Sequence, residues 1–292
     1  MTSKTILITG ASRGIGLLTA KTLAAQGHTV YASMRNPDGS NALVRDELVA
    51  WAKDTGAKLI PLEMDVTSAK SVDAAAARIL ADGPLDVLIN NAGIMPTGTT
   101  EAFTPEQTQA CFDVNMFGLA RVTQAFLPAM RDKKDGLIIS LSSAAGRLSI
   151  PFFGLYCASK WAMEAYCESL HFELEPFGVQ SVLVEPSGHG TDLVATAPTP
   201  ARTDVLDAYG DLSKGRDRML GMFESAFATG ADIHNAQNVA DAIAGLVNMT
   251  GPRPVRTQVG DDMGVNAINT ATQPVQDQLV NMLRPVYTGA AA

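Results

Sequence analysis

Residues 4–16 read KTILITGASRGIG, an apolar, β-branched run followed by three glycines and the start of a helical pattern. Gly10 permits a sharp turn, Gly14 lets the backbone approach a pyrophosphate at the positive end of a helix, and Gly16 lets that helix pack on a sheet. Ser12, Arg13 and Ile15 complete the loop. The stretch predicts a strand, a phosphate-binding turn and a helix. A plain glycine turn is the alternative.

The same alternation of short apolar runs and helical patterns continues along the chain. Strands are predicted over 4–9, 29–33, 58–64, 85–90, 137–141, 180–185 and 253–260, and helices over 15–26, 41–54, 68–80, 105–130, 155–175 and 239–247. This order predicts an α/β fold, a single doubly wound, Rossmann-like parallel sheet with helices on both faces. We expect one domain over 1–292, with an inserted substrate lid at about 188–232 and a C-terminal tail at about 261–292.

Composition excludes several classes of protein. The 292 residues carry 22 Lys and Arg against 30 Asp and Glu, a net charge of −8 without a basic block, so nucleic acid is not an expected partner. Three cysteines, an odd number in a large chain, indicate a reducing compartment. No apolar run reaches the roughly 18 residues of a membrane span, and we expect a cytoplasmic protein. His189 is expected on a loop surface, and no metal site is predicted.

Tyr156 and Lys160 are four residues apart, which places them on one face of a helix. A nearby cation favours a phenolate, so the pKa of Tyr156 should fall from about 10 toward the working pH, as general acid–base catalysis requires. Ser143 stands thirteen residues before Tyr156, at the end of a predicted strand. The adjacent Ser142 should point to the opposite face. Asn115 lies within the predicted helix 105–130, where it serves either catalysis or packing.

These motifs follow the order found in the short-chain dehydrogenase/reductase family, which the chain resembles from residue 5 to about 192. Asn90, Asn91, Ala92 and Gly93, which close the fourth predicted strand, belong to the same pattern. The length resembles that of the steroid, retinol and carbonyl reductases with long C-terminal parts. The resemblance implies hydride transfer between a nicotinamide and a lipophilic carbonyl or alcohol, in a homodimer or homotetramer.

The resemblance also implies a role for each residue of the site. Tyr156 would give or take the proton, Lys160 would lower its pKa and hold the ribose, Ser143 would bind the reacting oxygen, and Asn115 would position a relay water. Cofactor contacts are implied at Asp65, Val66, Asn91, Ala92, Gly93, Tyr156, Lys160, Pro186, Gly188 and Thr191. Asp65 could instead cap the following helix. Ser187 replaces the family's usual glycine after Pro186, and serine tolerates positive φ poorly, so an altered turn is expected.

The end of the second predicted strand indicates which dinucleotide binds. Met34 stands where NAD-preferring relatives place an aspartate, and Arg35 follows it. Arg35 and Arg13 can both donate charge-assisted hydrogen bonds to a 2′-phosphate, which predicts NADP in preference to NAD. The alternative is that Arg35 is a solvated loop residue and Arg13 assists either cofactor.

Apolar residues around these motifs are candidates for a lipophilic pocket, although each could equally belong to the core. They are Met95, Phe152, Phe153, His189, Leu193 and the stretch 219–227. A dinucleotide-binding regulator without turnover is the main competing function, but it would not need the Ser143, Tyr156 and Lys160 set. Epimerases and dehydratases also use a Tyr–Lys pair. They usually have another glycine spacing and a larger C-terminal domain.

Overall fold

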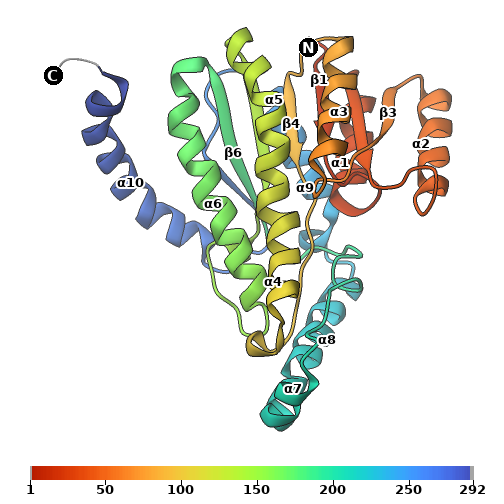
Figure 1. Ribbon diagram of the computed structural model, residues 1–292, viewed down its shortest axis with the longest axis vertical. Coiled ribbons are helices and arrows are strands. Elements are labelled where there is room, and N and C mark those ends of the chain that lie inside the picture. Colours follow the sequence, from red (N-terminus) through yellow and green to blue (C-terminus); the bar gives the residue numbers. More distant parts are fainter. Residues whose placement is uncertain (1, 290–292) are drawn as a thin grey trace.

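Seven parallel strands form one sheet in the computed structural model, which describes residues 2–289 (Figure 1). The order across the sheet is β3-β2-β1-β4-β5-β6-β7. The strands are β1 (Thr5–Ile8), β2 (Thr29–Met34), β3 (Lys58–Glu63), β4 (Val87–Asn90), β5 (Gly136–Leu141), β6 (Val179–Pro186) and β7 (Arg256–Val259). The predicted fold class is confirmed. The strand order reverses between β1 and β4, which creates a crevice at the carboxyl ends of these strands.

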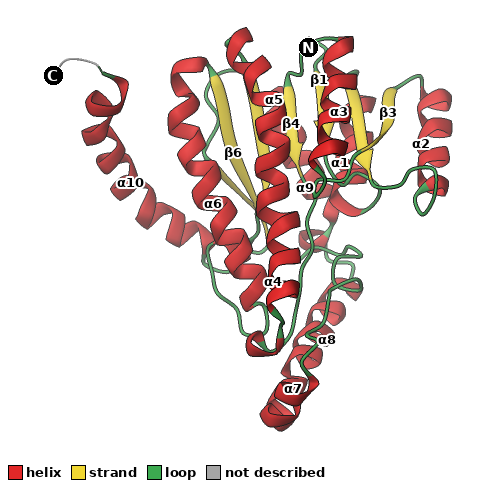
Figure 2. Ribbon diagram, viewed as in Figure 1, coloured by secondary structure: helices red, strands yellow, loops and turns green. Residues whose placement is uncertain are grey.

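Helices cover both faces of the sheet (Figure 2). One face carries α1 (Gly14–Ala25), α2 (Ala42–Thr55) and α9 (Ala236–Asn248), and the other carries α3 (Ala69–Asp82), α5 (Leu119–Lys133) and α6 (Gly154–Leu174). The strands alternate between the two layers, since Ile6 and Ile8 pack toward the first and Leu7 toward the second. Strands buried on both faces explain the continuous apolar runs in the sequence.

The predicted helix 105–130 is interrupted. It consists of α4 (Pro105–Phe112), a π-helical turn (Asp113–Gly118) and α5. The Asn115 side chain lies in this turn and forms hydrogen bonds with the backbone of Ile94, outside the helix. Such a bulge in a helix often marks a functional site.

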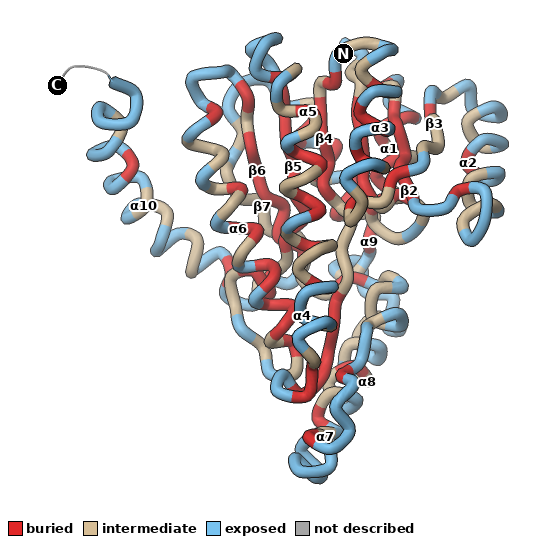
Figure 3. The backbone as a smooth tube through the Cα atoms, in the orientation of Figure 1, coloured by how far each residue is buried: buried red, intermediate tan, exposed pale blue. Residues whose placement is uncertain are grey.

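Residues 188–232, for which the sequence predicts an inserted lid, lie beyond the carboxyl ends of the strands (Figure 1). It contains two helices, α7 (Thr203–Tyr209) and α8 (Gly215–Ala228). Most of α7 is exposed, whereas most residues of α8 are exposed or partly buried (Figure 3). We call this segment the lid segment.

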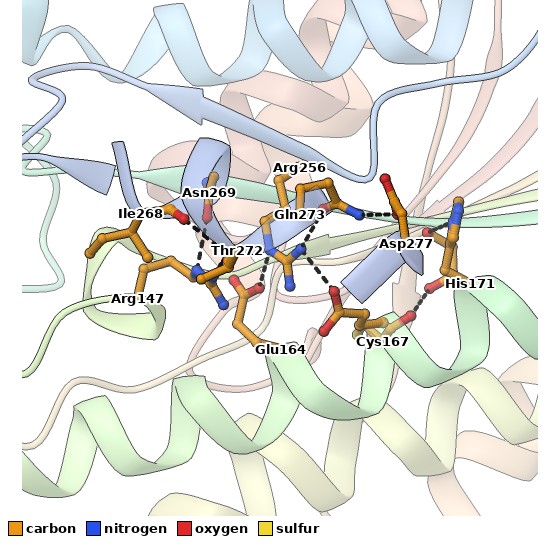
Figure 4. Close-up of polar contacts among 12 residues, drawn as sticks. Arg147, Glu164, Cys167, His171, Arg256, Ile268, Asn269, Thr272, Gln273 and Asp277 are labelled. Carbon is orange, nitrogen blue, oxygen red and sulfur yellow. Dashed lines mark hydrogen bonds and ion pairs between the residues drawn. The ribbon is translucent and has the colours of Figure 1, made fainter. Parts of the chain in front are cut away.

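Most of the C-terminal part, for which the sequence predicts a tail, is a helix. Helix α10 (Val265–Thr288) runs away from the body of the protein beside the β7 edge, and residues 290–292 lie outside the described residues (Figure 1). Its first turns are held by polar contacts (Figure 4): Arg147 donates to Asn269 (2.8 Å) and Thr272 (2.9 Å), and Arg256 donates to Gln273 (3.2 Å). Across residues 2–289, no helix, α10 included, is both long enough and apolar enough to cross a membrane.

Candidate active site

A cavity of about 480 Å³ runs along the carboxyl ends of the strands. One end is bounded by the glycine loop and the ends of β2 and β3, and the other by Tyr156 and the lid segment. The predicted site residues that line it are Gly10, Ser12, Arg13, Gly14, Ile15, Arg35, Asp65, Val66, Asn91, Ala92, Gly93, Ser143, Tyr156, Lys160, Pro186, Gly188 and Thr191. Gly16 and Asn115 do not line it, and each contacts residues that do.

Backbone conformation or close packing favours glycine at each of the three glycine positions of the loop. Gly10 and Gly14 have φ of 66° and 54°, in the left-handed region that favours glycine. A Cβ at Gly16 would lie 2.4 Å from Nδ2 of Asn91. That Nδ2 donates to the carbonyls of Thr9 (2.8 Å) and Gly10 (3.0 Å), so Asn91 braces the loop from β4. The backbone amides at the start of α1 therefore border the cavity.

Asp65 does not cap α3, contrary to the alternative considered from the sequence. Its Oδ1 accepts hydrogen bonds from the amide (2.9 Å) and the hydroxyl (2.8 Å) of Thr67. Ser68 is the N-cap, and its side chain accepts from the amide of Ser71 (3.3 Å). Asp65 thus holds a local turn at the wall of the cavity.

Tyr156 and Lys160 both project from α6 into the buried end of the cavity. Burial raises the pKa of Tyr156 to about 12, and a hydrogen bond with Ser143 opposes this only in part. Burial also lowers the pKa of Lys160 to about 8. The Lys160 ammonium donates to the carbonyl of Leu141 (2.6 Å) and lies 5.8 Å from the centre of the Tyr156 ring. The direction of the pKa shift of Tyr156 is the reverse of the expected one, because burial of the phenol is the largest contribution.

Ser143 and Ser142 point in different directions, as the alternation of extended residues requires. Ser143 accepts a hydrogen bond from the amide of Ala145 (3.1 Å) and faces Tyr156. The Ser142 hydroxyl lies against Gly146 and Glu164, on the side away from Tyr156.

Ser143→Ala is expected to lower turnover by about 10²- to 10³-fold, the effect of removing one hydrogen-bond donor to a developing oxyanion. Ser142→Ala should lower it far less, because this hydroxyl faces Glu164. Steady-state kinetics of both variants with one substrate make the comparison. Equal losses would mean that the orientation of these two serines does not determine their roles.

Asn115 joins three elements behind the cavity. Its Nδ2 donates to the carbonyl of Ile94 and its Oδ1 accepts from the amide of Ile94, both at 2.9 Å. Nδ2 also lies 2.9 Å from the hydroxyl of Ser159, which donates to the carbonyl of Tyr156 (2.8 Å). The π-helical turn is therefore tied both to the segment after β4 and to the helix that carries Tyr156.

The turn after β6 differs from one sequence expectation, and it accommodates Ser187 without strain. Ser187 does not adopt a positive φ, the conformation that serine tolerates poorly. His189 is buried, at 6% exposure, rather than on a loop surface. Its side chain lies against Gly260, after β7, where a Cβ would come within 2.7 Å of the ring. Burial lowers the pKa of His189.

Apolar side chains form the other end of the cavity. The rings of Phe153 and Phe223 meet edge to face at 6.0 Å, and Phe223 and Phe227 stack at 6.4 Å. Of the predicted pocket residues, Met95, Phe153, His189, Leu193, Phe223 and Phe227 line the cavity, whereas Phe152 and Met219 pack in the surrounding apolar cluster. The sequence analysis missed Ala145, Ile150, Val194 and Met263, which also line it.

The described part of the chain contains no cluster of metal-binding side chains. Among residues 2–289, no group of three or more His, Cys, Asp and Glu side chains could hold a metal ion. Cys111, Cys157 and Cys167 are free and buried.

Comparisons with known proteins agree with this geometry. The short chain dehydrogenase family matches residues 4–201. A 3-ketodihydrosphingosine reductase of Bacteroides thetaiotaomicron is 35% identical over 261 residues, 89% of each chain. The 17-beta-hydroxysteroid dehydrogenase type 1 of Homo sapiens is 40% identical over 188 residues, which cover 63% of this chain and 56% of that protein. The crystal structure of a short-chain dehydrogenase from Streptomyces avermitilis has a TM-score of 0.74 at 30% identity, with both chains fully covered. The chain belongs to the short-chain dehydrogenase family.

Proposed function

We propose that this protein is an NADP-dependent carbonyl reductase that interconverts a ketone or aldehyde and an alcohol on a lipophilic small molecule. One observation carries the proposal. A single cavity joins the glycine loop, the Ser143–Tyr156 pair and an apolar wall that includes Phe153, Phe223 and Phe227. A dinucleotide and an apolar substrate can therefore meet at one proton donor.

The dinucleotide end of the cavity fits the cofactor that the family implies. Gly10 and Gly14 bring the backbone to the cavity wall, as close approach of a pyrophosphate requires. Arg13 and Arg35 are exposed cations that line the same end, while Met34 occupies the end of β2 without offering a carboxylate. This combination supports NADP rather than NAD.

In the proposed mechanism, bound reduced nicotinamide supplies a hydride to the carbonyl carbon. The Ser143 hydroxyl donates a hydrogen bond to the substrate oxygen and so stabilises the charge that develops there. The phenol of Tyr156, with a pKa of about 12, is protonated at neutral pH and donates its proton to the same oxygen. The Lys160 ammonium then lies beside the phenolate that remains. Asn115 holds the backbone of Ile94 at the cavity wall.

The apolar end supports a lipophilic substrate. Burial against apolar side chains favours any lipophilic molecule of suitable size, so it indicates a class of substrate rather than one compound. The names of two relatives, a ketodihydrosphingosine reductase and a hydroxysteroid dehydrogenase, denote lipophilic carbonyl and alcohol compounds. A panel of ketones, aldehydes and alcohols, assayed with NADPH or NADP and with NADH or NAD by the absorbance of the reduced nicotinamide, tests the proposal. If the protein binds a dinucleotide but turns over none of these compounds, the competing function, a dinucleotide-binding regulator without turnover, is favoured.

The proposal also includes the oligomeric state of the protein and its location in the cell. Phe117, in the π-helical turn, and Trp161, on α6, are 49% and 47% exposed, which supports a homodimer or homotetramer formed through these helices. Three free cysteines support a cytoplasmic location.

Arg35→Ala is expected to weaken NADP binding by about 10- to 150-fold and to leave NAD binding nearly unchanged. The basis is the loss of one or more charge-assisted hydrogen bonds, worth roughly 1.5 to 3 kcal/mol each. Dissociation constants for both cofactors measure the effect. Arg45→Ala is the matched control, because Arg45 pairs with Asp38 and Asp46 and does not line the cavity. Parallel losses for the two cofactors would contradict the assignment.

A further inference from the structure

His234 connects the end of the lid segment to the turn after β6. It lies in the 3-10 turn Asp232–His234 that follows α8. Its Nδ1 is 2.9 Å from the carbonyl oxygen of Gly188, and its own carbonyl accepts from the amide of Gly190 (3.0 Å). Because a carbonyl can only accept, Nδ1 carries the hydrogen. Two hydrogen bonds thus join this 3-10 turn to residues 188–190, and Gly188 lines the dinucleotide cavity.

The same imidazole also contacts the wall of the substrate end. The ring of Phe227, on α8, meets the His234 ring edge-on at 5.4 Å. Phe227 also lies close to Gly188, since a Cβ added to Gly188 would be 3.2 Å from Cε1 of Phe227. Beyond Phe227, the stack continues through Phe223 to Phe153. His234 therefore stands where the cofactor turn and the aromatic wall meet.

Helix α8 packs Met219, Leu220 and Phe223 into the apolar cluster beside the cavity, and it has further contacts at each of its two ends. Only Gly215 and Leu220 are buried within it. At its N-terminal end, Arg216 donates to the carbonyl and the hydroxyl of Thr97, both at 3.1 Å. Its C-terminal end has the contacts of Phe227 with Gly188 and His234. A change in the turn at 188–190 would consequently move the end of α8 that carries the Phe227 ring.

We propose that His234 is a positioning residue that couples occupancy of the dinucleotide end of the cavity to the placement of α8 over the substrate end. The inference rests on the proposed function and adds to it a specific connection between the two ligands. A cofactor that orders residues 188–190 also fixes the acceptor of the His234 hydrogen bond. His234 in turn holds Phe227 in the substrate wall. Such coupling is reciprocal, so substrate binding should also strengthen cofactor binding.

Two variants of His234 and one control separate the contribution of its hydrogen bond from that of its ring. His234→Phe keeps a ring against Phe227 but removes the hydrogen bond to Gly188. His234→Asn keeps a side-chain donor but removes the ring. His171→Phe is the matched control, because Nδ1 of His171 is 3.0 Å from the carbonyl of Ser181 and its ring meets Phe172 edge-on at 5.3 Å, away from the cavity. Thermal unfolding of each variant shows whether the fold is retained.

The test compares trypsin cleavage of the lid segment with and without saturating NADPH, and NADPH affinity is measured separately from nicotinamide fluorescence. Lys214 and Arg218, with side chains 71% and 57% exposed, are suitable cleavage sites. We expect NADPH to slow cleavage in the wild type and in His171→Phe. In His234→Phe this protection should fall by about 2- to 10-fold at saturating NADPH, the effect of one neutral hydrogen bond. His234→Asn should retain NADPH affinity but raise KM for the ketone more than it lowers kcat.

The outcomes separate the coupling from the function. If the wild type binds NADPH and gains no protection, or if His234→Phe is protected as well as the wild type, the coupling is overturned while the reductase remains. If the wild type binds no dinucleotide, the proposed function is overturned, and the coupling with it. If His234→Phe does not fold, unchanged KM and kcat in His234→Asn overturn the coupling, and a selective rise in KM supports it.

Discussion

Tyr156→Phe is expected to lower turnover at least 10²-fold and to leave cofactor affinity little changed. The substitution keeps the buried ring and removes the proposed proton donor, and general acid catalysis contributes about 10²- to 10⁴-fold. Steady-state kinetics and NADPH titration of the same preparation separate the two effects. Tyr166→Phe is a control on the same helix, because Tyr166 does not line the cavity. Retention of more than a tenth of wild-type turnover by Tyr156→Phe would exclude Tyr156 as the donor.

The pKa of Tyr156 predicts how the rates of carbonyl reduction and alcohol oxidation change with pH. At about 12, the phenol is protonated throughout the neutral range, so it is ready to donate a proton in carbonyl reduction. Alcohol oxidation needs the phenolate as a base, and its rate should therefore rise with pH. Lys160, with a pKa of about 8, loses its charge above that pH, which should slow reduction there. In Tyr156→Phe the rise in oxidation rate that depends on phenolate formation should disappear.

The sequence predicted the parts of the fold that depend on local patterns. Strands buried on both faces leave uninterrupted apolar runs, and the glycines at 10, 14 and 16 lie where the chain turns and the helix meets the sheet. The Tyr156–Lys160 pair followed from the period of a helix, and the opposite orientation of Ser142 and Ser143 from that of an extended chain. These features need no knowledge of distant contacts.

The parts that the sequence missed depend on contacts between distant residues. Helix α10 contains Pro274 and Pro285, which disguise its helical pattern, and its first turns are held by Arg147 and Arg256. Burial of His189 depends on Gly260, about seventy residues further along the chain. Likewise, the pKa of Tyr156 is dominated by burial, which the spacing to Lys160 cannot reveal.

A buried ion cluster lies between α6, β6, β7 and α10, and Arg256 is its central cation (Figure 4). The Arg256 side chain is 7% exposed. Its Nε lies 3.1 Å from Glu164 and 3.3 Å from Glu185, and its Nη1 lies 3.0 Å from Glu168. Glu164 and Glu185 are themselves 3% and 0% exposed. Burial raises the pKa of Glu185 to about 7, with a further contribution from Glu164 and an opposing one from Arg256.

Arg256→Met is therefore expected to lower the free energy of unfolding by about 3 to 5 kcal/mol, because breaking a buried ion pair leaves uncompensated charge. A carboxyl group with a raised pKa binds more protons in the folded state, so its contribution to stability falls as pH rises toward that pKa. Removing Arg256 should raise the pKa of Glu185 further and extend this fall above pH 7. The stability deficit of Arg256→Met, measured by urea unfolding, should accordingly be larger at pH 8 than at pH 6. Arg284→Met, which removes the exposed pair with Glu175, should leave stability nearly unchanged at both pH values. A deficit independent of pH would show that Arg256 contributes packing rather than charge compensation.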